Sequence, residues 1–358
     1  MSDQHPTVPT WTPEAPPPPP RRRFGPGLVA GLIAVVVAFG GVGLFAARQV
    51  ASGTTDGAAS PEAAAASLLT ALGSQDLDRA AGYLETQERL LLATYGDRIT
   101  GLLARGVAGP GGQASSGIQL TARDIRFRRV AGLGGDSVAV VELADGTLGG
   151  RDARGAKLEL PVEELNRRLI NQTKGAVHAL RAVAVRDDDR WRVSLLASAA
   201  EHARLAAGAA EPDWDQLAAG LPDPAGAASP EAAVRDLVAA AENGQVAAVE
   251  RLAPAECRVL TAYQSLLAGG NGTPPKRAVR VEGLETRTEQ VTGEVARVHA
   301  TAGRLVGAMF DEAIDLRQAG EAGDAPYVVA IRQGGTWYPS LEFTTIDWML
   351  NQAERERP

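Results

Sequence analysis

The sequence predicts an α+β protein in which one transmembrane helix precedes two copies of a unit, each with N-terminal helices packed on a curved antiparallel sheet. Three observations lead to this prediction. Residues 25–47 carry no charge, a Ser-Pro-Glu helix start occurs twice, and a strand–turn–Trp–strand pattern also occurs twice. With 358 residues, the chain is long enough for two domains and additional segments.

The uncharged segment is predicted to cross a membrane. Gly25–Ala47 has 23 residues, and a helix of this length spans ~35 Å, which exceeds the ~30 Å of a hydrocarbon core. The apolar part of a cleaved signal peptide is shorter, roughly 7–15 residues. Arg21, Arg22 and Arg23 precede the segment and only Arg48 follows it at once. The positive-inside rule therefore places the N-terminus in the cytoplasm and the later domains outside the cell membrane.

Two features of the N-terminal region have alternative interpretations. Gly27 and Gly31 form a GxxxG spacing that can pair transmembrane helices, but the chain contains 40 glycines and the spacing can also reflect composition. Residues 1–23 form a proline-rich tail that cannot bury a core and is expected to be disordered. Its Pro16–Pro20 run either docks on an aromatic groove or stays solvated.

The composition makes several classes of function poor candidates. The formal net charge is −7, which is unfavourable for binding nucleic acid. Cys257 is the only cysteine, so an intramolecular disulfide and a cysteine-based zinc site are excluded. This thiol is either buried in a helix or available for an intermolecular disulfide. The four histidines are scattered, and neither a metal nor a cofactor is predicted.

An internal duplication organises the remainder of the chain. "SPEAAAASLLTALGSQDLDRAAGYL" begins at Ser60 and "SPEAAVRDLVAAAENGQVAAVERL" begins at Ser229. Each predicts a helix with Ser at the N-cap and Pro at the first helical position. The spacing then stays in step, since the series Leu84, Glu88, Leu92, Tyr95 is repeated as Leu252, Glu256, Leu260, Tyr263.

Each copy then changes to alternating strand patterns that end in a hairpin. These strands are expected within Ile118–Val130, Asp136–Leu143, Ala156–Leu160, Ala278–Val291 and Glu294–Gly303. "VAVRDDDRWRVSL" (Val183–Leu195) aligns without a gap to "VAIRQGGTWYPSL" (Val329–Leu341). Because Asp187–Asp189 align with Gln333–Gly335, we interpret the three aspartates as a tight turn and not as a metal or acid–base site.

The two copies differ in length, and the difference has a predicted location. The helix starts lie 169 residues apart and the tryptophans 146 apart, so the first copy has about 23 extra residues. Val162, Leu165 and Leu169 predict an additional short helix in that copy. The predicted divisions are a cytoplasmic tail 1–23, a transmembrane helix 24–48, a linker 49–59, a first domain 60–208, a linker 209–228 and a second domain 229–358. The second linker is expected to let the domains reorient.

The order of these motifs resembles a known family. "SPEAAxxxLLxALxxxDLxxAxxYL", a strand region and then "WxVSL" are similar to NTF2-like (cystatin-like) cone-shaped domains over residues 60–200 and 229–345. The closest similarity is to uncharacterised extracytoplasmic versions behind one transmembrane helix in actinobacteria. The resemblance implies a pocket between helices and sheet in each domain. It does not determine function, because the fold hosts dehydratases, isomerases, transport factors and assembly subunits.

Seven residues are candidates for lining such pockets, and each has an alternative structural interpretation. They are Glu88, Tyr95, Trp191, Glu256, Tyr263, His299 and Trp337. The glutamates are either solvated helix residues or polar anchors, whereas the tyrosines and tryptophans are expected in the cores. His299 alternates with apolar neighbours on a strand, so its side chain faces either water or the cone. These residues form no catalytic constellation, and none is predicted to be catalytic.

We therefore expect a non-catalytic, single-pass membrane protein that serves as an extracytoplasmic binding or assembly module. Its expected partners are the cytoplasmic membrane, through Gly25–Ala47, and an envelope protein or a second copy of the chain. Two alternatives stay open. One is a subunit of a conjugation, secretion or lipid-import machine of the envelope, a layout that the resemblance also suggests. The other is an envelope enzyme or small-molecule binder that uses one cone pocket.

Overall fold

A computed structural model describes most of the chain beyond the predicted membrane segment. The described residues are 57–74, 76–104, 119–151, 157–187, 189–219, 224–267, 280–306, 313–321 and 325–355. The predicted tail and transmembrane helix, with Arg21, Arg22, Arg23, Gly27 and Gly31, lie outside them. Among the described helices, none combines the length and apolar character needed to cross a membrane.

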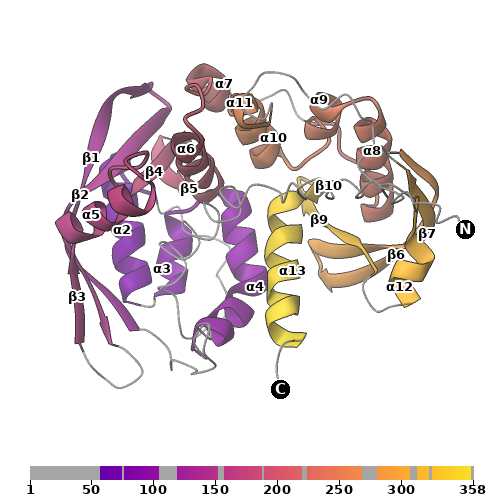
Figure 1. The fold of residues 1–358 in the computed structure, drawn as a ribbon, viewed down its shortest axis with the longest axis horizontal. Helices are drawn as coiled ribbons and strands as arrows, with labels where there is room; N and C mark the ends of the chain where they lie inside the picture. Colours follow the sequence, from indigo (N-terminus) through magenta and orange to yellow (C-terminus); the bar gives the residue numbers. More distant parts are fainter. Residues whose placement is uncertain are drawn as a thin grey trace, which may run out of the picture.

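The first half of the structure contains helices, a sheet and a closing helix in that order (Figure 1). Its elements are α2 (Pro61–Gly73), α3 (Leu77–Gly82), α4 (Thr86–Ala104), β1 (Gln119–Gly134), β2 (Val138–Arg151), β3 (Lys157–Pro161), α5 (Val162–Gln172), β4 (Arg181–Asp187), β5 (Arg190–Ser194) and α6 (Leu195–Ala207). The short helix α7 (Trp214–Ala219) follows. All the strand pairs are antiparallel, in the order β1-β2-β4-β5 with β3 on β2.

The second half repeats this topology. It contains α8 (Pro230–Glu242), α9 (Gln245–Val249), α10 (Pro254–Ala262), α11 (Gln264–Leu267), β6 (Arg280–Thr292), β7 (Val295–Val306), β8 (Ile314–Asp315), α12 (Leu316–Glu321), β9 (Tyr327–Gln333), β10 (Thr336–Ser340) and α13 (Leu341–Arg355). Its sheet has the order β10-β9-β7-β6 with β8 on β7. The α+β class with two antiparallel sheets is therefore confirmed.

The predicted helix starts have the same geometry in both halves. The hydroxyl oxygens of Ser60 and Ser229 each accept a hydrogen bond, at 3.2 Å, from the backbone N–H three residues later. This contact satisfies one of the unpaired donors at a helix N-terminus. The residues just before these helices pair with the strands that carry the tryptophans. Trp191 exchanges backbone hydrogen bonds of 2.9 Å with Ala58, and Trp337 does so with Ala227.

Asp187 and Asp189 lie at a hairpin turn, as predicted, whereas Asp188 lies outside the described residues. Strands β4 and β5 are joined so that Asp187 pairs with Arg190, and Asp189 adopts a left-handed φ of 61°. The equivalent Gly335 has a φ of 86°. The helix predicted at Val162–Leu169 is present as α5, but it is not additional to the first half: α12 occupies the equivalent place in the second half and is shorter, with six residues against 11.

Each sheet is covered on both faces: the predicted N-terminal helix packs on one face, and the other face is covered by the closing helix, which was not predicted. In the first half, Trp191 and alternate strand residues pack against α2, while Val138, Val140 and Val183 face α6 and α7. Side chains that alternate along a strand point to opposite faces, so every second residue contributes to a different core. The second sheet is covered by α8 on one face and α13 on the other.

The two halves share their cores across a junction. Leu91 and Tyr95 of α4 pack with Phe343 of α13, and Tyr263, which directly follows α10, packs in the cluster that contains first-sheet valines. Figure 1 shows α4 and α13 side by side in the middle of the molecule, with the sheets at opposite ends. The expectation of a reorienting linker is wrong, because α7 lies in that segment and its Leu217 is fully buried in the same shared core.

Candidate functional site

Two buried glutamates at the junction cap the closing helices of their own halves. Glu88 Oε1 accepts hydrogen bonds from the backbone N–H of Leu195 at 3.0 Å and from the Ser194 hydroxyl at 3.2 Å. Glu256 does the same in the second half, with the Leu341 N–H at 2.7 Å and with the Ser340 hydroxyl. Both glutamates are 1% exposed. A carboxylate placed here satisfies helix N–H groups and interacts favourably with the helix dipole.

Polar residues of the first half that have no repeat counterpart contact the second half next to the Glu256 cap. The side-chain amide of Gln87 donates to Glu256 Oε1 at 3.0 Å and to Glu342 Oε2 at 2.9 Å. Glu85, which precedes α4, forms an ion pair with Arg258 of α10. The start of α4 in the first half therefore meets α10 and the start of α13 in the second half.

The junction contains more acid than base. Its four carboxyl groups belong to Glu85, Glu88, Glu256 and Glu342, and Arg258 is their only ion-pair partner among the described residues. In addition, Glu85 Oε2, Gln87 Oε1 and Glu88 Oε2 are buried without a hydrogen-bond partner in the described structure. Buried carboxylates that lack counter-charges and donors favour the protonated form.

The pKa values of Glu88, Glu256 and Glu342 are raised accordingly. Burial raises the pKa of Glu256 to about 7, although hydrogen bonds from Ser340, Leu341 and Gln87 act in the opposite direction. Burial and the neighbouring Glu256 raise the pKa of Glu342 to about 8. For Glu88, burial is the main cause of a pKa well above the usual range, and the charges of Glu85 and Glu342 add to it. The cluster can thus hold a proton near neutral pH.

The same acidic residues form no metal centre. The described part of the chain contains no group of three or more His, Cys, Asp or Glu residues arranged to hold a metal ion. The cluster instead uses its oxygens for helix N–H groups, hydroxyls and an amide. Its supported chemistry is proton binding.

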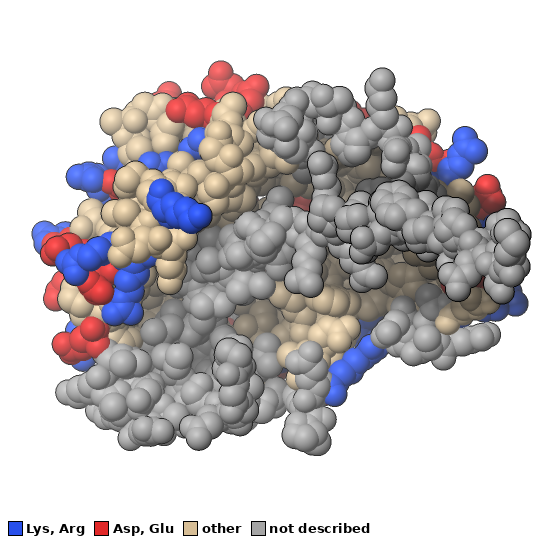
Figure 2. All heavy atoms as spheres, viewed as in Figure 1, with Lys and Arg blue, Asp and Glu red and all other residues tan. Residues whose placement is uncertain are grey.

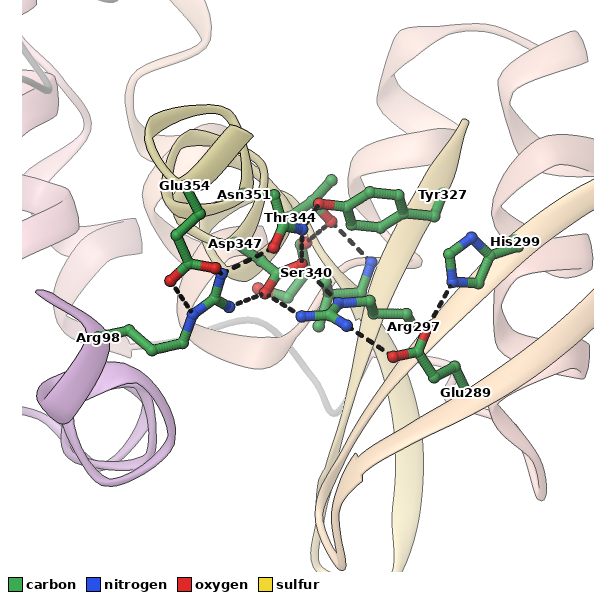
Figure 3. Close-up of polar contacts among 11 residues, drawn as sticks. Arg98, Glu289, Arg297, His299, Tyr327, Ser340, Thr344, Asp347, Asn351 and Glu354 are labelled. Carbon is green, nitrogen blue, oxygen red and sulfur yellow. Dashed lines mark hydrogen bonds and ion pairs between the residues drawn. The ribbon is translucent and has the colours of Figure 1, made fainter. Parts of the chain in front are cut away.

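A second polar network ties α13 to both its own sheet and the first half (Figure 3). Asp347 on α13 is fully buried and receives two hydrogen bonds from Arg297 of β7, Nε to Oδ2 at 2.7 Å and Nη2 to Oδ1 at 2.8 Å. Arg98 of α4 adds a third contact, Nη1 to Oδ1, at 3.0 Å. Arg98 also contacts Asn351 Oδ1 at 2.7 Å and Glu354 Oε2 at 3.1 Å.

His299 lies at the outer end of this network (Figure 3). Its Nε2 is 3.0 Å from Glu289 Oε2, and Glu289 Oε1 is 2.7 Å from Nη1 of Arg297. The His299 ring centroid lies 5.3 Å from that of Tyr327. Burial, followed by the nearby Asp347, raises the pKa of Tyr327 to about 12. The side chain of His299 is 16% exposed, so this pair reaches the surface more than Asp347 does.

The first half has a counterpart of this network with different partners. Glu201 of α6 occupies the position equivalent to Asp347 and is fully buried. It forms ion pairs with Arg181 at 2.9 Å and with Arg204 at 2.7 Å. Tyr263 from the second half lies beside it, and its pKa is raised by burial and by the charge of Glu201.

The structure places the seven predicted pocket residues in different surroundings. Glu88 and Glu256 both lie at the junction, each within the polar group around Gln87 and Glu342, whereas Trp191 and Trp337 lie in the separate cores under α2 and α8. The remaining three are each engaged by an aromatic ring: Tyr95 by Phe343 at 5.9 Å, Tyr263 by Trp214 at 6.2 Å, and His299 by Tyr327.

Several residues of the junction were missed by sequence reasoning. Asp347 could have been found, because it and Glu201 are separated by the same 146 residues as the two tryptophans. Gln87, Arg98 and Glu342 carried no such signal, since the equivalent positions in the other half hold different residue types.

Comparison with known proteins adds no relative to this description. No protein-family model, no curated protein and no solved structure matches the chain. The resemblance to NTF2-like domains therefore stays a prediction.

Proposed function

We propose that this protein is a single-pass membrane protein whose two NTF2-like halves act outside the cell membrane as one fused, non-catalytic binding or assembly module. The anchor and its orientation rest on the uncharged Gly25–Ala47 segment and the preceding arginines. The observation that carries the proposal is that the predicted polar pocket residues, Glu88 and Glu256, cap helices and lie where the two halves join. Glu88 and Glu256 are occupied by helix N-termini, and residues around them link the halves.

A fused pair suits assembly because it holds two sheets in a fixed relation. The packing of α4 on α13 and of α10 near α6 commits both halves to one arrangement. A rigid surface loses less conformational entropy on binding than two tethered domains do. The outer surface also fits a protein partner better than a polyanion. In Figure 2, basic and acidic residues alternate along the edge where α5 and the first sheet lie, as in the pair Arg168–Glu164 at 2.9 Å.

One observation favours the alternative of a small-molecule binder or enzyme. The His299–Glu289 pair beside Tyr327 combines a titratable ring with a carboxylate and a hydroxyl. Such a pair can act as a general base, because a carboxylate that accepts a hydrogen bond orients the imidazole. In this structure, however, Glu289 is also held by Arg297, so the pair forms one end of the Asp347 network.

Purification of the full chain in detergent distinguishes these functions. We expect it to migrate as a complex with a second envelope protein, or as a defined oligomer, in size-exclusion chromatography with light scattering and native mass spectrometry. The matched variants are His299→Ala and Glu62→Gln, the latter in the first turn of α2. Neither is expected to change the assembly.

A single-copy protein would contradict the assembly function. If that protein also carried a small molecule that is lost in His299→Ala and kept in Glu62→Gln, the binder would replace it as the better description.

A further inference from the structure

The junction brings together carboxyl groups from three elements that different parts of the chain supply. Glu85 directly precedes α4 and Glu88 lies in its first turn, whereas Glu256 lies on α10 and Glu342 at the start of α13. The nearest basic groups are already engaged. Arg258 is paired with Glu85. Arg89 donates to the Thr86 hydroxyl and lies near the charges of Arg192, Asp187 and, with the smallest influence of the three, Glu88, but it forms no ion pair with that glutamate. No described arginine or lysine forms an ion pair with the other three carboxyl groups.

The hydrogen-bond donors are distributed unequally among these three groups. Glu256 receives the Ser340 hydroxyl, two backbone N–H groups and the Gln87 amide, a set that suits an ionised carboxylate. Glu88 Oε2 has no partner, and Glu342 shares the single amide nitrogen of Gln87 with Glu256. One amide cannot neutralise two carboxylates, so full ionisation leaves like charges facing each other across the junction.

From this geometry we propose that the junction is a proton-dependent latch between the two halves. It is closed when Glu342 or Glu88 carries a proton, and it loosens when that proton is released to solvent and all three carboxyl groups are charged. The elements that carry these groups also carry the shared core, since α4 packs on α13 through Tyr95 and Phe343. Repulsion at the cluster therefore acts directly on the contact between the halves. This device is independent of the partner and of the membrane anchor.

The direction of the pH dependence follows from the raised pKa values. Burial and Glu256 raise the pKa of Glu342 from 4.5 to about 8 in the folded protein. A group with a raised folded-state pKa contributes stability that is fully present below its unfolded pKa and is lost as the pH rises through the folded one. The latch is thus expected to be closed near pH 5 and to loosen between about pH 7 and pH 9.

Hydrogen–deuterium exchange of the full chain in detergent tests the latch. The wild type and Glu342→Gln are compared at the same pH from 5 to 9, so that the intrinsic pH dependence of exchange cancels in their ratio. In peptides from α10 and from the start of α13, we expect a ratio near one at pH 5. At pH 9 the wild type is expected to exchange about tenfold faster, because only its residue 342 ionises. A peptide from α2 is expected to show no difference at either pH.

A matched control separates the latch from a general effect of removing a helix charge. Glu62 and Glu342 both lie in the first turn of a helix, but Glu62 lies outside the junction. Glu62→Gln is therefore expected to leave the ratio at one across the pH range. If Glu342→Gln does not fold, Glu342→Leu replaces it, because leucine is the residue at the equivalent position 196.

Two results would overturn the latch. One is a ratio at the junction that stays constant between pH 5 and pH 9. The other is a wild-type to variant exchange ratio that rises with pH by the same factor in the α2 peptide as at the junction. Such a result would report unfolding of the entire chain.

Discussion

Helices α6 and α13 begin with the same cap and then differ at their second residue. Both start after a serine whose hydroxyl contacts a buried glutamate, Glu88 in one half and Glu256 in the other. The second helical residue is Leu196 in α6, which packs against an apolar cluster, and Glu342 in α13, which faces Gln87. The duplicated residues thus build each half, whereas the residue that differs lies where the halves meet.

The same contrast appears deeper along the two helices. Glu201 on α6 is paired with two arginines from its own half, Arg181 and Arg204. Asp347 on α13 is paired with Arg297 from its own half and with Arg98 from the other. Glu201 of α6 therefore forms ion pairs only within its own half, whereas Asp347 of α13 forms ion pairs with both halves. An internal duplication can therefore keep a fold symmetric while its junction becomes asymmetric.

The largest expected effect concerns the ion pair that crosses the junction. Asp347→Asn is expected to lower the free energy of unfolding by about 3–5 kcal/mol, because it leaves two arginines facing a neutral group in a buried site. A double-mutant cycle with Arg98→Met is expected to give a coupling energy of about 2 kcal/mol. Urea denaturation of the full chain in detergent, followed by tryptophan fluorescence, measures both quantities.

Helix α6 supplies the control for this cycle. Arg98→Met combined with Glu201→Gln is expected to be additive within about 0.5 kcal/mol, because the two residues share no partner. Equal coupling of Arg98 to Asp347 and to Glu201 would show that the contrast between the helices has no energetic consequence.

Substitutions that exchange the residue types at the second position of α6 and α13, Leu196 and Glu342, are expected to have a smaller effect. At pH 8, Leu196→Glu is expected to destabilise the chain by about 2 kcal/mol, because it places a carboxylate against an apolar cluster. Glu342→Leu is expected to stabilise it by about 1 kcal/mol, an amount that allows for the partial exposure of this side chain. The same urea titrations measure these changes.

The pH dependence of this exchange has a defined sign. Because the pKa of Glu342 is raised to about 8, its protonated form predominates at pH 5, and the benefit of Glu342→Leu is expected to disappear there. A gain that is equally large at pH 5 and pH 8 would contradict an unfavourable charge at residue 342 as its cause.

Comparison of these regions also shows what the sequence could predict. The Ser60 and Ser229 caps, the strand patterns and the hairpin turns depend on neighbours within a few residues, and repetition made each of them visible twice. The second face of each sheet was not predicted, because the pattern of α13 gives no information about which surface it contacts. The open linker was predicted wrongly, because the burial of Leu217 depends on a core built by distant strands.

The candidate site was less predictable than the fold for the same physical reason. Gln87 and Glu342 are 255 positions apart in sequence, and their contact exists only after both halves have folded. A charged residue in the first turn of a helix is ordinary on its own. The partial burial of Glu342, and with it the raised pKa, depends on contacts with the other half of the molecule.

The smallest expected effect lies at the two hairpin turns. Asp189 has a φ of 61° and is equivalent to Gly335, which has a φ of 86°. A left-handed conformation is unfavourable for a residue with a Cβ atom, although aspartate tolerates it better than most. The ion pair that Asp189 forms with Arg186 at 2.8 Å lies at an exposed site and is expected to contribute little to stability.

Asp189→Gly is therefore expected to stabilise the chain by about 0.5 kcal/mol, and Gly335→Asp is expected to destabilise it by a similar amount. Opposite signs in the two urea titrations would support an equivalent turn in both halves, whereas destabilisation by Asp189→Gly would show that the aspartate has a role in the first hairpin that glycine cannot replace.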